Sequence, residues 1–553
     1  MTSSPVSPAT SKDHQYIAVA ESSTDAARAK NKFEYPLDAM YGSILNYEFP
    51  DVTKQDTAAD VQALRETFRS GATRDLKQRR ELLLQLQRLM KEGEAMMKEA
   101  AWKDLHKHPT ETYACEISLI NQEIQDFLDH LEDWSKPEMT LTSLTNLPGL
   151  SYICRDPLGV VCVVSTWNYP INLLFMPLIP ALAAGNCVLL RLPGDDTTRY
   201  LNNVFITLLD KYMDKRFVRY VYGGVEETKA MLRERYDLIF ATGGGFLGKI
   251  IARSAAEYLT PMVLELGGKS PAIIDETVDI TIAARRLTWG AFTNAGQTCV
   301  RPDYLLVDER VGDKLVAEIE KNVRAFYGED PKESNGYGRI VNARAFARLN
   351  TIVQADKARI TFGGVADEKE SYISPTMLNF KTDLDGFVSS KAMEDELFGP
   401  LLPIYYYPAG KLQAAIDFVS AREKPLALYF YSTNSKNKQR VVRETTAGSM
   451  VINDSMMQLS NPHLPFGGVG SSGMGAYHGR HGFDAFSHRK AVMYKYSLLD
   501  LPARYMPYTA ASERMLRLLL YPVSRRQLRV VKLLGLAVVL VAIGFIIKAA
   551  VDN

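Results

Sequence analysis

Apolar residues in the first part of the chain recur at the spacing of one helix face. Between residues 82 and 97, leucine and methionine follow each other at helical intervals among lysine, arginine, glutamate and glutamine. This pattern predicts an amphipathic helix. Further helix is expected to about Trp134, before Pro137 breaks the pattern. The alternation of threonine and leucine from Thr140 to Leu144 then predicts a strand.

Farther along, short apolar runs alternate with helical stretches. Wholly apolar runs occupy Val160–Val164, Cys187–Leu190 and Leu238–Phe240, and helices are expected at Leu173–Ala184 and Tyr200–Met213. This alternation predicts an α/β fold in which helices cover both faces of a parallel sheet. Such a sheet binds dinucleotides at the carboxyl ends of its strands. The pattern therefore predicts a cofactor domain of the Rossmann type.

The N-terminal segment has a different composition. Residues 1–57 are rich in serine, threonine, alanine, aspartate and proline, and they show no sustained apolar period. A segment of this kind cannot bury enough apolar surface to fold alone. It also lacks the apolar stretch of a signal peptide. We expect a disordered N-terminal extension.

An apolar segment lies near the C-terminus. Residues 530–551 contain the unbroken apolar run Leu533–Ile547, and as a helix they would be about 33 Å long, roughly one hydrocarbon core. Lys532 and Lys548 lie near the ends, where their side chains can reach the interfaces. A buried core helix is the alternative. The all-round apolar character favours a single-pass membrane anchor, and the basic residues before it favour a catalytic part that faces the cytosol. These basic residues are Arg525, Arg526 and Arg529.

Length, charge and cysteine content exclude some classes of protein. A chain of 553 residues is too long for one core, so two or three domains are expected. The net charge of +1 gives no electrostatic case for binding nucleic acid. The five cysteines form no CxxC pair, which favours a reducing compartment. No metal is expected, because no histidine or cysteine cluster has the spacing of a metal site.

Two motifs carry the candidate chemistry. Glu265 begins the stretch Glu265–Pro271, and Cys299 ends the stretch Phe292–Cys299. A cysteine thiolate can attack a carbonyl carbon, and a carboxylate held nearby can act as a general base on water. A lone cysteine would more often be a small buried apolar residue. Both motifs together favour a catalytic pair over a buried cysteine and a salt-bridged glutamate.

The two stretches, including their separation, resemble the aldehyde dehydrogenase superfamily. Lys103–Lys107, Leu464–Gly470 and Ser472–Gly479 are similar to its class 3 branch, which contains the fatty aldehyde dehydrogenases. The resemblance extends from about residue 58 to about residue 510. Membrane-bound members of this branch carry an apolar C-terminal tail like this one, and fungal relatives include beta-apo-4′-carotenal oxygenases. The resemblance therefore implies a long apolar aldehyde, either a fatty aldehyde or an apocarotenal, as the substrate.

The resemblance also implies catalytic roles. Cys299 attacks the aldehyde, hydride leaves to a nicotinamide, and water activated by Glu265 hydrolyses the resulting thioester. Asn168, directly after an apolar run, would donate its amide to the oxyanion together with the backbone N–H of Cys299. Taken alone, Asn168 would more often be a turn or cap residue. With the other motifs present, the oxyanion hole is the favoured interpretation.

A cofactor site is predicted at the glycine-rich turn Thr242–Lys249. The turn follows an apolar run and opens a helix, where backbone N–H groups can hold a phosphate. The resemblance makes Glu396 a ligand of the nicotinamide ribose and places Phe398 beside the ring. The resemblance also implies that residues of the turn, and the residues directly after Glu265, contact the cofactor. The residues concerned are Gly243, Gly244, Gly245, Phe246, Leu247, Gly248, Leu266 and Gly267.

The chain departs from the family pattern at the adenosine ribose. Where the family commonly has Lys-Pro-Ser-Glu, this chain has Arg191-Leu192-Pro193-Gly194. Arg191 can still donate to the ribose hydroxyls. Asp195 could replace the missing glutamate and favour NAD, whereas Arg191 could instead accept the 2′-phosphate of NADP. We expect NAD, with NADP possible.

The resemblance finally implies an organisation and a homodimer. The expected parts are an NAD(P)-binding domain (58–137 and 157–267), a catalytic domain (268–470), a small sheet of dimerisation strands (138–156 and 485–497), a linker (498–529) and the anchor (530–551). Two other functions stay open from the residues. One is a non-catalytic membrane-bound binding or scaffold protein that retains the fold. The other is a thioesterase-like cysteine hydrolase, which would leave the cofactor turn without a use.

Overall fold

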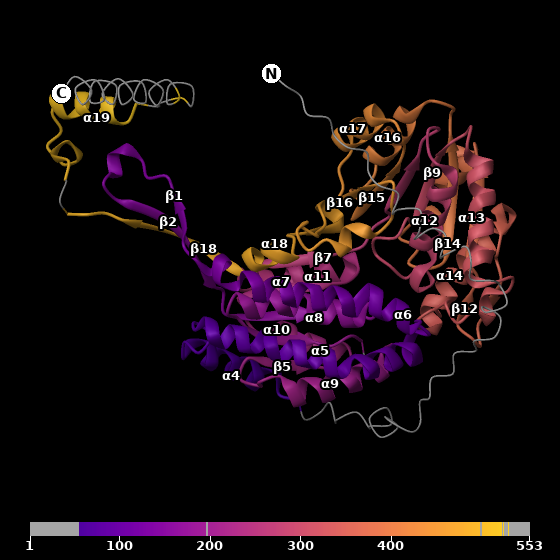
Figure 1. Cartoon of the computed structure of the whole chain (residues 1–553), viewed down its shortest axis with the longest axis horizontal. Helices are drawn as coiled ribbons and strands as arrows, with labels where there is room; N and C mark the ends of the chain where they lie inside the picture. The colour runs from indigo at the N-terminus through magenta and orange to yellow at the C-terminus, as the bar shows by residue number, and fades with distance from the viewer. Residues whose placement is uncertain (1–54, 195–196, 498–499, 522–523, 525–528, 530–553) are drawn as a thin grey trace, which may run out of the picture. The chain divides into compact units, whose positions relative to one another are not determined.

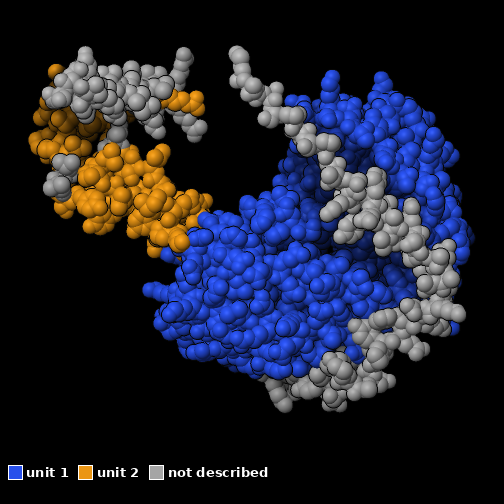
Figure 2. Space-filling model, viewed as in Figure 1, with its two compact units in different colours: residues 1–135, 156–488 blue, residues 136–155, 489–553 orange. Residues whose placement is uncertain are grey.

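The computed structural model describes residues 55–194, 197–497, 500–521, 524 and 529. It divides into two compact units (Figure 2). Unit 1 comprises residues 1–135 and 156–488, and unit 2 comprises residues 136–155 and 489–553. Unit 1 holds two large sheets, and every candidate site residue predicted from the sequence belongs to it.

Helices open the described part of the chain. The amphipathic helix predicted at residues 82–97 is confirmed, and it is longer than predicted: α5 spans Leu76–Leu105 with its leucine and methionine face buried. Helix α4 (Thr57–Arg69) starts inside the expected disordered extension. Asp56 caps it by accepting from the Ala59 N–H at 3.0 Å, and Gln55 bonds the backbone of Tyr222. These capping and backbone contacts order residues 55–57.

Unit 1 contains a six-stranded sheet in the order β17-β7-β6-β3-β4-β5. All neighbours in it are parallel except β17, which runs antiparallel to β7. The chain builds from β3 outward to β5 and then returns to the other side of β3, so the sheet has a topological switch point at β3 and β6. The three predicted apolar runs are confirmed as strands. The strands are β3 (Val160–Val164), β4 (Cys187–Arg191), β5 (Val218–Val221), β6 (Leu238–Thr242), β7 (Met262–Glu265) and β17 (Gly473–Met474).

Helices cover this sheet on both faces (Figure 1). Helix α8 contacts β3 and β4, and α5 packs on α8 and α9, while α11 contacts β6 and β7. The helices expected between the apolar runs are confirmed as α8 and α9. The covering helices are α7 (Ser118–Ser135), α8 (Pro170–Ala183), α9 (Arg199–Tyr212), α10 (Val225–Arg233) and α11 (Gly245–Ala256).

A seven-stranded sheet in the order β10-β13-β14-β9-β8-β15-β16 forms the rest of unit 1. Its strands are parallel except β10, which runs antiparallel to β13. The strands are β8 (Pro271–Ile274), β9 (Tyr304–Asp308), β10 (Ile360–Phe362), β13 (Thr376–Lys381), β14 (Leu401–Tyr407), β15 (Ala427–Tyr431) and β16 (Ser449–Ile452).

Helices and short elements accompany this sheet. The helices are α12 (Ile280–Phe292), α13 (Gly312–Tyr327), α14 (Ala343–Ala355), α15 (Leu384–Ser389), α16 (Leu412–Ser420) and α17 (Ser435–Glu444). The short elements are α6 (Pro109–Thr112), the π-helical turn η2 (Tyr113–Ile117), the strand pair β11 (Ala366–Asp367) and β12 (Tyr372–Ile373), and α18 (Gly479–Ala485).

A three-stranded sheet in the order β1-β2-β18 belongs largely to unit 2. Its strands are β1 (Glu138–Thr140), β2 (Leu150–Pro157) and β18 (Ser487–Tyr494), followed by α19 (Ala510–Leu519). The strand predicted at Thr140–Leu144 is misplaced, because β1 ends at Thr140. Leu141 is fully exposed, and the Asn146 side chain bonds Ser143 Oγ at 2.8 Å, so local polar contacts form a turn there. The role of this sheet in dimerisation stays a prediction.

No helix within the described residues is both long and apolar enough to cross a bilayer. The anchor predicted at 530–551 lies outside the described residues.

Candidate active site

The loop after β3 carries Asn168 to the switch point of the sheet. Asn168 is 1% exposed, and its side-chain N–H donates to the Gln297 carbonyl at 3.1 Å. In return, Asn294 Nδ2 donates to the Asn168 carbonyl at 2.8 Å. The loop after β3 is therefore joined to the turn that precedes Cys299. This arrangement brings Asn168 and Cys299, which are far apart in the sequence, to one site.

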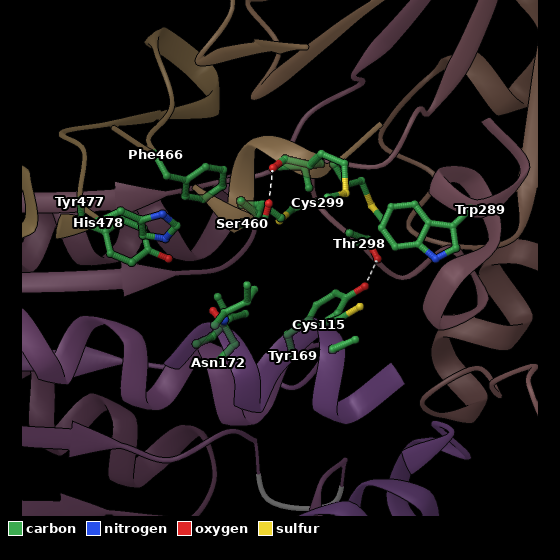
Figure 3. Close-up of a pocket in the computed structure, with 17 residues that line it drawn as sticks. Cys115, Tyr169, Asn172, Trp289, Thr298, Cys299, Ser460, Phe466, Tyr477 and His478 are labelled. Atoms are coloured by element: carbon green, nitrogen blue, oxygen red, sulfur yellow. Dashed lines mark hydrogen bonds between the residues drawn. The ribbon is translucent and has the colours of Figure 1, made fainter. Parts of the chain in front are cut away.

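The turn that holds Cys299 has an unusual backbone. Asn294 and Ala295 follow the end of α12 in left-handed conformations, with φ of 54° and 51°. At Gly296 a Cβ would lie 2.3 Å from the Gly399 carbonyl oxygen, so only glycine fits. Strained backbone of this kind persists where the surroundings fix it, and it clusters at active sites. The Thr298 hydroxyl is fixed by a 2.8 Å hydrogen bond with the Tyr169 hydroxyl (Figure 3).

Glu265 ends β7, and its side chain enters the same region. Its residue is 3% exposed, and neither carboxylate oxygen has a hydrogen-bond partner among the described residues. Burial raises the pKa of Glu265 well above its usual value. A carboxylate whose pKa is raised is a stronger base than an ordinary one, which suits Glu265 to accept a proton from water.

Electrostatics connect Cys299 to two carboxyl groups. Burial raises the pKa of Cys299 to about 12, and the negative charges of Glu396 and Glu265 add to this rise. The backbone N–H groups of Cys299 and Val300 oppose it. The cysteine is therefore a thiol at neutral pH in this structure. Both carboxyl groups are close enough to influence its ionisation.

Cys299 is among the residues that line a cavity of about 250 Å³ (Figure 3). His478 belongs to its wall, and burial lowers the pKa of this histidine to about 4, so the ring is neutral at physiological pH. The ring stacks on Phe466 with centroids 5.4 Å apart. Most of the lining is apolar. Its apolar members include Leu119, Leu173, Trp289, Val300, Met456, Met457, Leu459 and Phe466.

The glycine-rich turn lies between β6 and α11, as predicted. Gly244 caps α11 and Gly245 begins it, while the Gly243 N–H donates to the Glu265 carbonyl at 3.0 Å. A Cβ at Gly244 or Gly245 would meet no atom within 4 Å, so open space lies in front of this helix N-terminus. Phe246, in the first turn, is 81% exposed.

Two further glycines of the turn serve packing. Leu247 Cδ2 would lie 2.8 Å from a Cβ at Gly243, and Leu266 Cδ2 would lie 2.8 Å from a Cβ at Gly248. Glycine at these positions lets α11 approach the end of β7 closely. The turn and the Glu265 strand therefore form one packed unit.

Glu396 and Phe398 lie on the loop before β14. A Cβ at Gly267 would be 2.0 Å from Glu396 Oε2, so this carboxylate lies directly against the Glu265 motif. Its Oε1 has no partner among the described residues, and burial raises the pKa of Glu396 to about 8. Phe398 has a φ of 47°. Its ring packs edge-on against the Trp167 ring, with the two ring centroids 5.4 Å apart.

Arg191 ends β4 but points its donors at protein atoms. Nε donates to Thr228 Oγ1 at 3.0 Å, and the terminal nitrogens donate to the carbonyls of Leu192 and Gly223. The side chain is buried. The contact with a ribose stays a prediction, because it would require these donors to be shared or released. Asp195 lies outside the described residues.

Two functional candidates were missed at the level of sequence. Lys107 and Glu116 form a fully buried ion pair beside Asn168. Lys107 lies in a stretch that carries the family resemblance, but the stretch gives no role for it. Glu116 lies in a π-helical turn, which helical periodicity does not reveal.

The sequence model of the aldehyde dehydrogenase family matches residues 42–492. The chain belongs to the aldehyde dehydrogenase family. It is an NAD(P)-dependent enzyme, and the alternative of a fold retained only for binding is set aside. Curated relatives from Rattus norvegicus and Dictyostelium discoideum carry the name aldehyde dehydrogenase family 3. The resemblance to the class 3 branch is therefore confirmed.

Two curated relatives and one solved structure illustrate the similarity of this aldehyde dehydrogenase to known proteins. The 4,4′-diaponeurosporen-aldehyde dehydrogenase of Staphylococcus aureus is 41% identical over 441 residues, which cover 80% of this chain and 94% of that protein. The dimeric NADP-preferring aldehyde dehydrogenase of Rattus norvegicus is 41% identical over 457 residues, covering 83% and 98%. A structure of the substrate-bound state of Staphylococcus aureus AldH has a TM-score of 0.80 at 39% identity, covering 83% and 99%.

Proposed function

We propose that this aldehyde dehydrogenase oxidises long apolar aldehydes, fatty aldehydes or apocarotenals, to carboxylic acids. The observation that carries the proposal is the apolar cavity that Cys299 helps to line. A hydrocarbon chain gains about 0.8 kcal/mol for each methylene that it buries in such a cavity. The relative from Staphylococcus aureus, whose name specifies a diaponeurosporene-derived aldehyde, supports a polyene as one possible chain.

The chemistry of the proposal follows from three side chains. The Cys299 thiol gives its proton to water, and its sulfur then adds to the aldehyde carbon. The carbonyl double bond opens, and the oxygen that becomes an oxyanion is held by the Asn168 amide and the Cys299 N–H. After hydride leaves that carbon, the group is a thioester on Cys299. Glu265 then takes a proton from a water molecule, whose oxygen attacks the thioester and releases the acid. This last role is supported by the buried carboxylate of Glu265, which has no hydrogen-bond partner in the described part of the chain.

The residues around the glycine-rich turn fit a dinucleotide. The open space at Gly244 and Gly245 lies at the N-terminus of α11, where N–H groups favour a pyrophosphate. Glu396 Oε1, which no described residue hydrogen-bonds, suits a ribose hydroxyl, and Phe398 would pack beside the nicotinamide. Bound NAD(P) supplies the acceptor for the hydride. We propose NAD as the preferred cofactor, with NADP accepted, because Arg191 already bonds Thr228 and backbone carbonyls.

The location of the enzyme is also proposed. Residues 530–551 would anchor it as a single span, with the chain before residue 530 on the cytosolic side. The sequence of that segment supports this, and an anchored site would meet aldehydes that partition into lipid. We further propose a homodimer, for which the name of the rat relative gives support.

A series of aldehydes of increasing chain length tests the substrate proposal. We expect kcat/KM, measured by formation of reduced cofactor, to rise by about fourfold per methylene until the cavity is filled. Apocarotenals extend the series, and the ratio of kcat/KM with NAD and with NADP gives the cofactor preference. Values that stay flat or fall with chain length would contradict a long apolar substrate.

Cys299→Ala provides the control for this series. It should abolish the formation of reduced cofactor with every aldehyde, because the thiolate makes the covalent bond. Cofactor binding should persist, since the glycine-rich turn lies elsewhere. Normal turnover by this variant would exclude the proposed nucleophile.

A further inference from the structure

Lys107 and Glu116 form an ion pair that water does not reach. Lys107 Nζ lies 2.8 Å from Glu116 Oε1, and both side chains are 0% exposed. Transferring two charges from water into a protein interior costs several kcal/mol per ion unless further hydrogen bonds satisfy them. Within the described residues, the other side-chain hydrogen bonds of this pair are made with the segment Asn168–Asn172. The pair is therefore satisfied by the loop after β3 and the helix that follows it.

Lys107 holds the loop that carries the oxyanion-hole candidate. Its Nζ donates to the Asn168 carbonyl at 2.9 Å. The same ammonium lies 4.1 Å from the centre of the Tyr169 ring, at cation–π distance. One cation thus fixes two consecutive residues of the loop after β3.

Glu116 holds the helix that follows this loop. Its Oε2 accepts hydrogen bonds from the backbone N–H groups of Ile171 at 2.9 Å and Asn172 at 3.1 Å. These N–H groups belong to the first turn of α8, where no intrahelical acceptor is available and a negative charge is favoured. Glu116 lies in the π-helical turn η2, a feature often found at functional sites.

The two residues held by Lys107 are those that contact the Cys299 turn. The Asn168 amide donates to the carbonyl of Gln297, and the Tyr169 hydroxyl bonds the hydroxyl of Thr298. Gln297 and Thr298 directly precede Cys299 in the sequence. A continuous chain of contacts therefore runs from the buried pair, through Asn168 and Tyr169, to the nucleophile.

We propose that Lys107 and Glu116 are positioning residues, which orient Asn168 and the start of α8 so that the oxyanion hole is formed before substrate binds. The proposal rests on the proposed role of Asn168 as an oxyanion donor. An oxyanion hole is effective because its donors are already in place when charge develops. A displacement of about 1 Å in such a site can cost about 10²-fold in rate.

A double-mutant cycle on the full-length enzyme tests the coupling. Asn168→Ala should lower kcat/KM by about 10²–10³-fold. Lys107→Met should lower kcat/KM by about 10–10²-fold when Asn168 is present. It should lower it by less than about threefold in the Asn168→Ala background, because a residue that acts only through Asn168 loses its effect there. The cofactor Kd should stay unchanged throughout.

Lys103→Met is the matched control. Lys103 lies four residues before Lys107, in the last turn of α5, and pairs with Glu99 at 3.5 Å, but its side chain is partly exposed. We expect its kcat/KM to equal that of the native enzyme. Glu116→Gln keeps the size and an acceptor oxygen, and it replaces Lys107→Met in the cycle if the latter does not fold.

Two outcomes separate this proposal from the proposed function. If Asn168→Ala alone leaves the rate unchanged, the oxyanion role of Asn168 fails. If Asn168→Ala is slow but Lys107→Met lowers the rate by the same factor in both backgrounds, or changes only Tm, the positioning role is overturned and the oxyanion hole stands.

Discussion

Cys299 and Glu265 are electrostatically coupled at the scale of single residues. Burial holds the thiol protonated, and the charge of Glu265 adds to this effect. Glu265 itself has a raised pKa through burial. Two acids that each disfavour the ionisation of the other cannot both be charged at low cost. The charge that one of them carries therefore sets the reactivity of the other.

Glu265→Gln should make the resting thiol more reactive while it impairs turnover. At a pH above the pKa of Glu265, native enzyme carries a carboxylate that raises the pKa of Cys299, and the amide removes this charge. The variant should therefore be alkylated faster by iodoacetamide, and the difference should grow as the pH rises. Its turnover should fall through slow thioester hydrolysis, visible as a burst of reduced cofactor. Slower alkylation at every pH would instead show that Glu265 deprotonates the thiol.

The candidate site was predictable where a residue carries its own chemical group. The sequence singles out Cys299, Glu265 and Asn168, because each lies in a short stretch with a recognisable pattern. The sequence could not show that the Arg191 side chain donates its hydrogen bonds to Thr228 and to backbone carbonyls. It also gave no sign of Glu116, because the partners of a buried charge come from distant segments.

At the scale of elements, fully buried strands were the easiest to predict. β3, β4 and β6 are continuous apolar runs because helices cover both faces of their sheet. β1 was misplaced because its three residues are all exposed, so no apolar pattern marks them. The short pair β11 and β12 has the same difficulty, since a two-residue strand shows no period.

The N-terminus of α11 allows a prediction that separates binding from folding. Gly245→Val adds methyl groups to open space, since a Cβ there meets no atom within 4 Å. Tm should therefore change little. The KM for the cofactor should rise by about an order of magnitude, because the methyls would occupy space needed by a phosphate at the helix N-terminus.

Gly248→Ala is the comparison for that variant. Its Cβ would lie 2.8 Å from Leu266 Cδ2, so we expect a lower Tm from crowding between α11 and the end of β7. Differential scanning fluorimetry and cofactor titration measure the two effects. An unchanged cofactor KM in Gly245→Val would place the phosphate elsewhere.

At the scale of the whole molecule, the anchor proposal predicts a separation of activity from location. An enzyme that ends at Arg529 should retain its kcat on short, water-soluble aldehydes, because the residues proposed for catalysis lie in unit 1. Its activity on aldehydes embedded in vesicles should fall. The full-length protein should stay in the membrane fraction after alkaline carbonate washing, and the shortened form should not. Full-length enzyme released by carbonate would contradict the anchor.

The composition of the cavity wall has a consequence for the end of the catalytic cycle. Among the described residues that line the cavity, none is lysine, arginine, aspartate or glutamate, and His478 is neutral. The transfer of an uncharged aldehyde from water into such a cavity costs little free energy. The acid formed from it ionises, and an anion without a counter-charge is costly to hold in apolar surroundings. The reaction thus converts a substrate that the cavity binds well into a product that it binds poorly. Oxidation itself therefore promotes the release of product.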